Sequence, residues 1–292
     1  MSKGSSIIDY FRITVPYYMP IAMLGIFVGL ATSGGVINYS FLLSLASVVT
    51  LVAAFNTFNG VTDFKIDLIN KPYRPIPSGK VSRNFALAYS EFFYIVSLFI
   101  AYQLTLQFFQ IMLLSSIVTI FYSLPVISLR KRFLISNLSG AILYGVLCPL
   151  AGWALMPTNP IPFFILGFTF LFSLSLSMSK DFEDFIGDRV YKIKTIPVVL
   201  GVGKAKILST LMLSLSFAYL IVLAALGLIK IQYLLAIITL PAFVMLIRRM
   251  YKYHQSFYNS IEDRKFARRI FLMLMGLAIL VEFSIGIIAI IF

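Results

Sequence analysis

The sequence predicts an all-α polytopic membrane protein with nine transmembrane helices. Hydrophobic residues make up 60% of the 292-residue chain, and only 12% of its residues are charged. The mean hydropathy of the chain is +0.95. A soluble fold of this length needs far more polar surface than that composition provides. Because backbone inside lipid must satisfy its own hydrogen bonds, each membrane span is expected to be a helix.

Nine apolar stretches are long enough to cross a bilayer, which requires about 20 apolar residues per helix. In chain order they cover residues 15–32, 40–58, 84–103, 108–127, 136–155, 161–179, 205–228, 231–247 and 270–291. The links after the odd-numbered spans are short and nearly free of charge, whereas those after the even-numbered spans are longer and basic. A missed or additional span would destroy this alternation, so the alternation supports the count of nine.

The distribution of basic residues predicts the orientation. Every lysine and arginine except Lys230 falls in the N-terminal segment or in or beside a link after an even-numbered span. Basic segments remain on the cytoplasmic side of a membrane. We therefore expect a multi-pass protein of the cell membrane whose N-terminus is cytoplasmic and whose C-terminus lies outside. The net charge of +13 then reflects loops that face an anionic leaflet, and no nucleic-acid partner is expected.

Cysteine and histidine are too scarce to supply several common kinds of active site. The single cysteine, Cys148, excludes an intramolecular disulfide and a cysteine-based metal site. The single histidine, His254, argues against a histidine-dependent mechanism. No cleavable signal is apparent, and the first apolar segment is expected to remain in the mature protein.

Two short acid-rich stretches contain six of the eleven carboxylates in the chain. The first contains Asp63 and Asp67, preceded by the amides Asn56 and Asn59, and the second contains Asp181, Glu183, Asp184 and Asp188. Each stretch follows an even-numbered span. We therefore expect both at the cytoplasmic edge of the membrane, in two motif loops near residues 56–83 and 180–204.

The spacing of these acids predicts a divalent-metal site. Asp63 and Asp67 are four residues apart, as are Asp184 and Asp188, and on a helix each pair would lie on one face. Paired carboxylates repel one another unless a cation lies between them, and Mg²⁺ prefers oxygen ligands. The candidate metal ligands are Asn59, Asp63, Asp67, Asp181, Asp184 and Asp188. Solvated acidic loops and a general acid–base pair are the alternatives, but the repeated spacing favours metal and resembles an internal repeat.

Basic residues after each acid stretch are candidates for binding a diphosphate. The candidate set comprises Asn56, Lys71, Arg74, Lys131, Lys180 and Lys194. Arginine offers a bidentate fork to phosphate, although orientation in the membrane alone would also explain basic residues here. Arg74 lies in the Pro-Tyr-Arg-Pro-Ile-Pro-Ser-Gly run of residues 72–79, which cannot continue a helix and is expected to form an ordered turn near the first acid stretch.

Together these features suggest ionisation of an allylic diphosphate. Metal and cations would stabilise the departing diphosphate, so Asp63, Asp67, Asp184 and Asp188 are the candidate catalytic carboxylates. An aromatic ring can stabilise the remaining carbocation through a cation–π contact. Tyr122, at the cytoplasmic end of the fourth span, is the best-placed ring, with an ordinary interfacial role as the alternative.

The residues resemble the motifs of the UbiA superfamily of intramembrane prenyltransferases over nearly the whole chain. The first family motif has the form N-x-x-N-D-x-x-D-x-x-x-D, and Asn56, Asn59, Asp63 and Asp67 match it with Gly60 in place of the usual aspartate. Asp181, Asp184, Gly187 and Asp188 match the second motif, D-x-x-D-x-x-G-D. The resemblance implies nine transmembrane helices around a central cavity with cytoplasmic cap loops, in a single domain over residues 1–292.

Within the superfamily, residues 69–82 and 180–201 are most similar to the archaeal digeranylgeranylglyceryl phosphate synthases. That similarity implies Mg²⁺-dependent transfer of a geranylgeranyl group from its diphosphate to a lipid acceptor, geranylgeranylglyceryl phosphate. Chlorophyll synthases share the first run, so transfer to an aromatic or quinone-precursor ring, or a chlorophyll-type reaction, remains an alternative. A secondary transporter is less favoured, because transporters place ionisable residues near the bilayer midplane. The expected partners are a prenyl diphosphate, a lipid acceptor and the bilayer.

Overall fold

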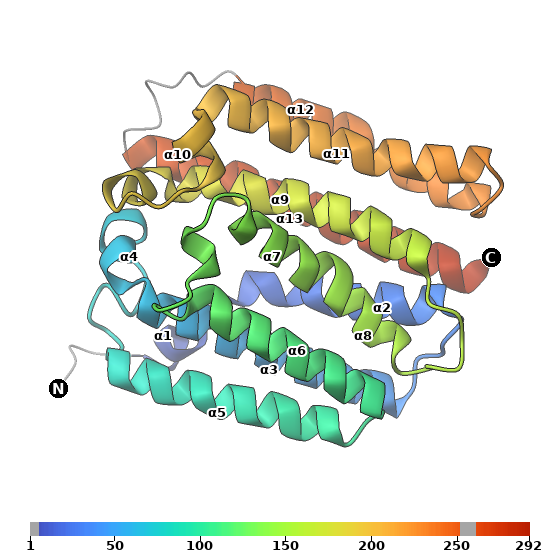
Figure 1. Ribbon diagram of the computed structural model, residues 1–292, viewed down its shortest axis with the longest axis horizontal. Coiled ribbons are helices and arrows are strands. Elements are labelled where there is room, and N and C mark those ends of the chain that lie inside the picture. Colours follow the sequence, from blue (N-terminus) through green and yellow to red (C-terminus); the bar gives the residue numbers. More distant parts are fainter. Residues whose placement is uncertain (1–5, 252–260) are drawn as a thin grey trace.

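Long helices run side by side along one axis of the molecule (Figure 1). The computed structural model describes residues 6–251 and 261–292. Within these ranges only the backbone is described for residues 244, 247, 248, 250, 251 and 261–264. His254 therefore lies outside the described residues. The α-helices are α1 (Ile7–Arg12), α2 (Met19–Thr32), α3 (Tyr39–Thr62), α4 (Phe64–Asn70), α5 (Arg83–Tyr102), α6 (Leu106–Ser123), α7 (Ile135–Ile142), α8 (Cys148–Trp153), α9 (Phe163–Val190), α10 (Ile196–Leu200), α11 (Val202–Ala225), α12 (Leu240–Tyr251) and α13 (Ile261–Ile291). Three short 3₁₀ segments, η1 (Pro16–Tyr18), η2 (Leu129–Lys131) and η4 (Ile231–Thr239), and one π-helical turn, η3 (Leu143–Leu147), complete the described chain.

Seven helical segments of the described chain are long and apolar enough to cross a membrane. They coincide with seven of the nine predicted spans. The other two predicted spans, residues 15–32 and 231–247, fall on shorter apolar helices, Pro16–Thr32 and Ile231–Phe243. The structure thus confirms an all-α polytopic membrane protein, without confirming nine spans.

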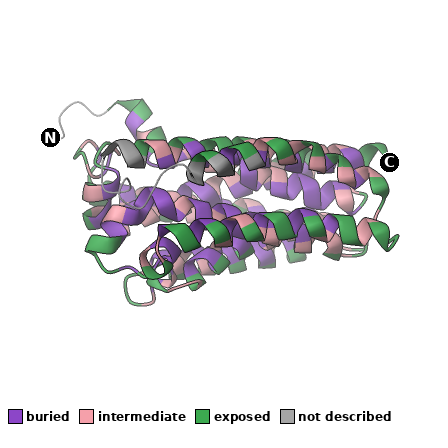
Figure 2. Cartoon of the chain, turned by 90° about the horizontal axis from the view of Figure 1, so that it is seen from above, coloured by how far each residue is buried: buried purple, intermediate pink, exposed green. Residues whose placement is uncertain are grey.

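The bundle is apolar outside and partly polar inside, as expected of a protein surrounded by lipid. On α5, Phe92, Ile95 and Phe99 are exposed, whereas Ser97 is fully buried. Figure 2 shows the same division along the other helices, with buried residues on the faces that turn toward neighbours. Ser47 and Ser97 each donate a hydrogen bond to the backbone carbonyl of the other, at 2.9 and 2.8 Å, which holds α3 against α5. Small polar residues commonly join helices in this way inside membranes.

A π-helical turn interrupts the fifth predicted span and shapes the wall of the central pocket. Pro149 has no N–H to donate to the carbonyl of Gly145, four residues earlier, so the regular ladder cannot continue. Thr169 on α9 donates its hydroxyl to that carbonyl instead. The resulting turn η3 separates α7 from α8, and it carries the two pocket-lining residues Leu143 and Tyr144.

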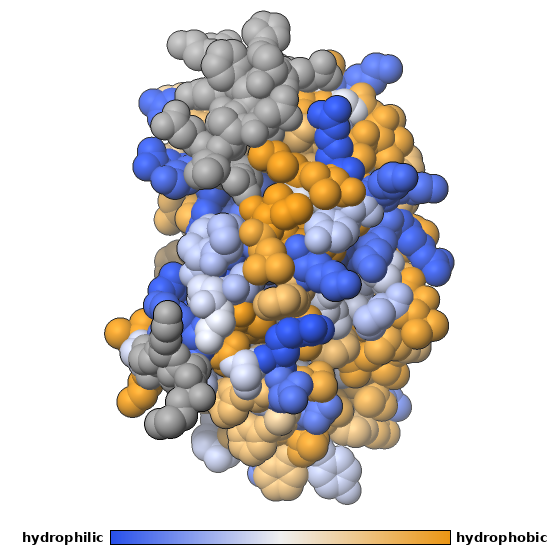
Figure 3. Space-filling view, turned by 90° about the vertical axis from the view of Figure 1, so that its left-hand side faces the viewer, coloured by the Kyte–Doolittle hydropathy of each residue, from blue (hydrophilic) through white to orange (hydrophobic). Residues whose placement is uncertain are grey.

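The polar connections gather at one end of the bundle, where α4, α10 and the link between α6 and α7 lie (Figure 1). We call this the loop end. Figure 3 faces it and shows hydrophilic side chains interspersed with apolar ones. The acids differ here from the predicted motif loops: Asp63 lies at the junction of α3 and α4, and the second stretch forms the last turns of α9. Because backbone hydrogen bonding continues through both stretches, the acids are held on helices.

Candidate functional site

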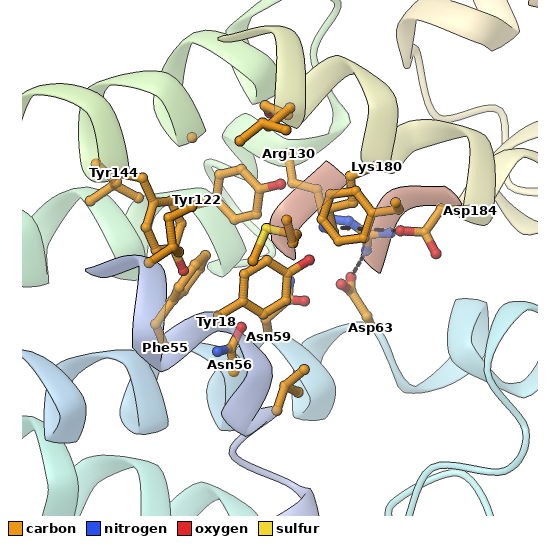
Figure 4. A pocket seen from close by; sticks show the side chains of 18 of the residues that line it. Tyr18, Phe55, Asn56, Asn59, Asp63, Tyr122, Arg130, Tyr144, Lys180 and Asp184 are labelled. Atoms are coloured by element: carbon orange, nitrogen blue, oxygen red, sulfur yellow. Dashed lines mark ion pairs between the residues drawn. The ribbon is translucent and has the colours of Figure 1, made fainter. Parts of the chain in front are cut away.

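A pocket at the loop end brings the two acid stretches together. It contains about 940 Å³ of space, including the part that opens to solvent. Its charged side chains are Asp63, Asp67, Lys71, Arg74, Arg130, Lys180 and Asp184. Its aromatic and large apolar side chains are Val15, Tyr18, Ile21, Phe55, Tyr122, Leu143, Tyr144, Leu176, Phe271 and Met275. In Figure 4 the labelled Phe55 and Tyr144 lie on one side and the ion pairs on the other, so this pocket, which we call the charged pocket, has a more apolar and a more polar side.

Asp63 and Asp67 occupy successive helical turns at the junction of α3 and α4. The amide of Asp63 donates to the carbonyl of Asn59 at 2.9 Å, and the amide of Asp67 donates to the carbonyl of Asp63 at 2.8 Å. Both acids are buried, Asp63 with 5% of its surface exposed. Burial raises the pKa of the Asp63 carboxyl above its ordinary value, and Arg130 opposes that rise. The predicted arrangement of both carboxylates on one helical face is therefore present.

The proline-rich run forms the predicted turn and places Arg74 on the first acid stretch. The amide of Arg74 donates to the carbonyl of Lys71 at 3.0 Å, and the amide of Ser78 donates to the carbonyl of Arg74 at 3.0 Å. The guanidinium of Arg74 lies 3.1 Å from Asp67. Burial alone would lower the pKa of Arg74, but the Asp67 carboxylate raises it above the ordinary value. Arg74 thus stays charged inside the pocket.

Lys71 and Asn70 join the first stretch to the second. Lys71 forms a buried ion pair with Asp184, whose exposed fraction is 4%. Burial would lower the pKa of Lys71, but Asp184 raises it well above its usual value. The Asn70 amide donates to the carbonyl of Asp184 at 2.9 Å and accepts from the amide of Gly187 at 2.7 Å. A Cβ at Gly187 would lie 2.6 Å from the Asn70 side chain, so glycine permits this contact between α4 and α9.

Arg130 is a pocket residue that the sequence reasoning did not single out. It is buried, forms an ion pair with Asp63, and lies 3.4 Å from Asp188. One guanidinium therefore bridges the two acid stretches. Ser128 adopts a left-handed conformation (φ 41°) immediately before η2, and this local turn accompanies the inward position of Arg130. The sequence does not show whether Arg130 or its neighbour Lys131 is buried, because only the direction of the short turn decides which side chain faces inward.

Of the other predicted diphosphate-binding and metal-binding residues, only some line the charged pocket. Lys180 lines the pocket 4.0 Å from Asp184. Lys131 and Lys194 are exposed and lie outside the pocket lining, although the amide of Lys194 donates to the carbonyl of Lys131 at 3.3 Å. Asp181 and Asp188 are buried behind the lining, where Asn137 donates to Asp181 at 3.0 Å.

The two predicted amides and Tyr122 do line the pocket. Asn56 donates to the carbonyl of Thr14 at 3.2 Å, and Asn59 donates to the Ser123 hydroxyl at 3.4 Å, which leaves their side-chain oxygens as acceptors. The Tyr122 ring meets Phe55 edge-on at 5.4 Å between centroids.

Further aromatic residues of the lining escaped sequence reasoning. Tyr18 stacks with Tyr144 at 6.1 Å and approaches Phe271 at 6.2 Å. No signal marks these rings in a chain that contains 16 Tyr and 28 Phe. Their faces are electron-rich and attract cations.

The donor set suits a hard cation such as Mg²⁺. The carboxylates Asp63, Asp67 and Asp184 and the amide of Asn59 line one pocket, and all offer oxygen. Within residues 6–251 and 261–292, no group of three or more His, Cys, Asp and Glu side chains has a metal-binding arrangement. The carboxylates instead contact Lys71, Arg74 and Arg130. The donors therefore fit Mg²⁺ in chemistry, and their cationic partners suit the phosphate groups that accompany it.

The fold and the site together define a membrane-embedded helical protein whose buried ionic cluster adjoins an apolar cavity. Residues 19–275 match the UbiA prenyltransferase family. The digeranylgeranylglyceryl phosphate synthase of Methanosphaera stadtmanae is 35% identical over 184 residues, which are 63% of this chain and 66% of that relative. The synthase of the same name from Methanothrix thermoacetophila is 30% identical over 88% of this chain and 91% of its own length.

Solved structures show the same fold. A UbiA homologue from Archaeoglobus fulgidus bound to GPP and Mg²⁺ superposes with a TM-score of 0.75 at 19% identity, covering 97% of this chain and 99% of that one. A structure from a study of digeranylgeranylglyceryl phosphate synthase in membranes gives a TM-score of 0.63 at 24% identity, with 94% and 98% covered. The chain belongs to the UbiA prenyltransferase family.

Proposed function

We propose that this protein transfers a geranylgeranyl group from its diphosphate to geranylgeranylglyceryl phosphate, in ether-lipid synthesis, with Mg²⁺ as cofactor. The observation that carries the proposal is the charged pocket, in which both acid stretches and four cations meet an aromatic, apolar wall. The relatives named digeranylgeranylglyceryl phosphate synthase support the choice of donor and acceptor.

In the proposed reaction the donor's allylic C–O bond breaks and its electron pair leaves with the diphosphate. A new C–O bond forms to the glycerol hydroxyl of the acceptor, and the proton of that hydroxyl passes to the departing diphosphate. Mg²⁺, held by Asp63, Asp67 and Asp184 with Asn59, would neutralise charge on the leaving diphosphate. Within this chain, Lys71, Arg74, Arg130 and Lys180 supply positive charge from the pocket wall. Because these cations lie in the pocket wall before charge develops on the diphosphate, they can stabilise that charge as it forms.

The aromatic half of the pocket suits the prenyl group. Tyr18, Phe55, Tyr122 and Tyr144 line it and would exclude water from the reacting carbon. Their ring faces would stabilise positive charge on the allylic carbon. A second, almost wholly apolar pocket shares Phe55, Leu143 and Tyr144 with the charged pocket and contains about 390 Å³ of space, including the part that opens outward. We assign the prenyl tail to the apolar side of the charged pocket and this adjoining space.

The proposal includes the finer topology. We propose that residues 1–292 form a single domain with nine spans, in the cell membrane, with the loop end and N-terminus cytoplasmic. The two shorter segments rise to about the length needed: at about 2.0 Å per residue for a 3₁₀-helix and 1.5 Å for an α-helix, the 3 residues of η1 and 14 of α2 rise about 27 Å, and the 9 residues of η4 and 12 of α12 rise about 36 Å. A bilayer core is about 30 Å thick.

An acceptor screen tests the proposal. Protein in nanodiscs would receive labelled geranylgeranyl diphosphate with Mg²⁺ and either geranylgeranylglyceryl phosphate or an aromatic quinone precursor. We expect product only with the lipid acceptor. Asp63→Ala and Asp184→Ala should nearly abolish turnover while the protein remains inserted and folded. Consumption of the aromatic acceptor alone, or full activity in both variants, would contradict the proposal.

A further inference from the structure

Arg268 lies on the helix that forms one edge of the charged pocket, one turn nearer the loop end than the lining residues. Phe271 and Met275 of α13 line the pocket. Arg268 precedes them by three and seven residues, a spacing that places all three on one helical face. Its side chain remains 32% exposed. Arg268 therefore lies beside the charged pocket, toward the loop end, with its side chain partly exposed.

The side chain of Arg268 is held by groups from three other elements. Its Nε lies 4.0 Å from the carboxylate of Glu183 on α9. Its Nη1 donates to the hydroxyl of Tyr73, and that hydroxyl donates to Glu183 at 3.4 Å. The guanidinium carbon lies 4.8 Å from the Tyr73 ring centroid and 6.0 Å from that of Tyr17. Burial and Glu183 raise the pKa of Tyr73 to about 12, so the tyrosine keeps its proton as a donor.

This arrangement leaves binding capacity on Arg268. A guanidinium has five N–H donors, and the contacts to Glu183 and Tyr73 use Nε and Nη1. Nη2 makes no hydrogen bond to any residue in the described part of the chain. By contrast, Lys71, Arg74 and Arg130 are each closely paired with a pocket carboxylate. Arg268 is thus an oriented cation beside the pocket, and no described residue uses the donors of its Nη2.

The proposed acceptor carries a suitable anion. Its phosphate and its nucleophilic hydroxyl occupy neighbouring carbons of one glycerol, so the phosphate must lie near the reacting carbon and outside the diphosphate position. Tyr17 connects Arg268 to the pocket, because its ring contacts Arg268 and also lies 4.8 Å from the ring of Tyr18, which lines the charged pocket. We propose that Arg268 binds the phosphate of the lipid acceptor and selects phosphorylated acceptors. This inference rests on the proposed function.

Steady-state kinetics of Arg268→Gln test the inference. In nanodiscs of zwitterionic lipid, we expect the KM for geranylgeranylglyceryl phosphate to rise about 10- to 100-fold, since a charge-assisted hydrogen bond is lost. The KM for geranylgeranyl diphosphate should not change. The preference for the acceptor over unphosphorylated geranylgeranylglycerol should shrink by a similar factor. Arg268→Lys should recover part of the loss.

Arg269→Gln is the matched control, because Arg269 is the exposed neighbour on the same helix and carries the same charge. It should keep the acceptor KM of the wild type. An unchanged acceptor KM in Arg268→Gln, or an equal rise in both KM values, would overturn the assignment. A rise confined to nanodiscs with anionic phospholipid would also overturn it and identify bulk lipid headgroups as the ligand.

Failure of the proposed function gives a different result. In that case the wild type forms no product with geranylgeranylglyceryl phosphate. Thermal unfolding of the wild type with that lipid alone then decides the inference separately. A shift that Arg268→Gln abolishes and Arg269→Gln retains supports the phosphate site, and the absence of a shift in the wild type overturns it.

Discussion

Replacement of Arg130 by methionine should destabilise the protein and stop turnover, because it leaves two buried carboxylates without their shared partner. The Arg130 side chain is 8% exposed, and those of Asp63 and Asp188 are 7% and 2% exposed. Methionine retains an apolar stem of similar length but no charge. The substitution therefore removes the bridge between the acid stretches with little change in packing.

The burial of all three partners determines the expected magnitude. An exposed ion pair contributes about 0–1 kcal/mol, and the pair of Asp9 with Lys80, whose lysine side chain is 44% exposed, belongs to that class. Removal of one partner from a buried pair costs about 3–5 kcal/mol. For a domain of this size, that loss lowers the unfolding temperature by about 5–15 °C.

Thermal unfolding in detergent, read alongside product formation, measures both effects. The control is Lys131→Met, since Lys131 is adjacent and exposed, and its unfolding temperature should remain within about 1–2 °C of the wild type. The double variant Arg130→Met with Asp188→Asn should recover part of the stability, because one of the unpaired charges is gone, but none of the activity. Equal unfolding temperatures for Arg130→Met and Lys131→Met would refute the reasoning.

Three further predictions concern the metal and two glycines. Inorganic diphosphate with Mg²⁺ should raise the unfolding temperature of the wild type, by an amount equivalent to about 2.7 kcal/mol at 100 times the dissociation constant. Either component alone should give the wild type a much smaller shift, and so should both components together in Asp184→Asn. Gly60→Asp restores the acid usual in the first motif, and a Cβ at this position would meet only the end of the Ile76 side chain, at 3.3 Å. The Mg²⁺ concentration that gives half-maximal activity should be lower in Gly60→Asp than in Gly60→Ala. An equal or higher concentration would count against metal binding at this acid stretch. Gly29→Ala should lower the free energy of unfolding by at least about 2 kcal/mol, because its Cβ would lie 1.8 Å from the Pro149 carbonyl oxygen. The control is Gly203→Ala, which has open space around its Cβ and should leave the unfolding temperature unchanged in the same assay.

Much of the fold follows from local sequence properties. Apolar length and the alternation of charged links predicted the helical segments, because a bilayer demands both from each span separately. The proline-rich run around Arg74 was also predictable, since proline excludes helix at its own position. These features depend on residues close together in the chain.

The details of the site depend on contacts between distant segments. Arg130 and Lys131 are adjacent basic residues of the same link, yet the structure buries Arg130 and exposes Lys131. Asp181 and Asp184 share one helical face by spacing, but Asn137 binds the first and Lys71 the second. Such differences arise from the direction of a turn and from the neighbour that each helix meets.

The sequence by itself determined that the protein lies in a membrane, where its helical segments are, and where the two acid stretches fall. Hydropathy and residue spacing settle these features because they are properties of short segments. Only the tertiary structure decided which charges meet, which aromatic rings enclose the pocket, and that Arg268 lies beside it. Those features join α4, α9 and α13, which are far apart in the chain and come together only through packing.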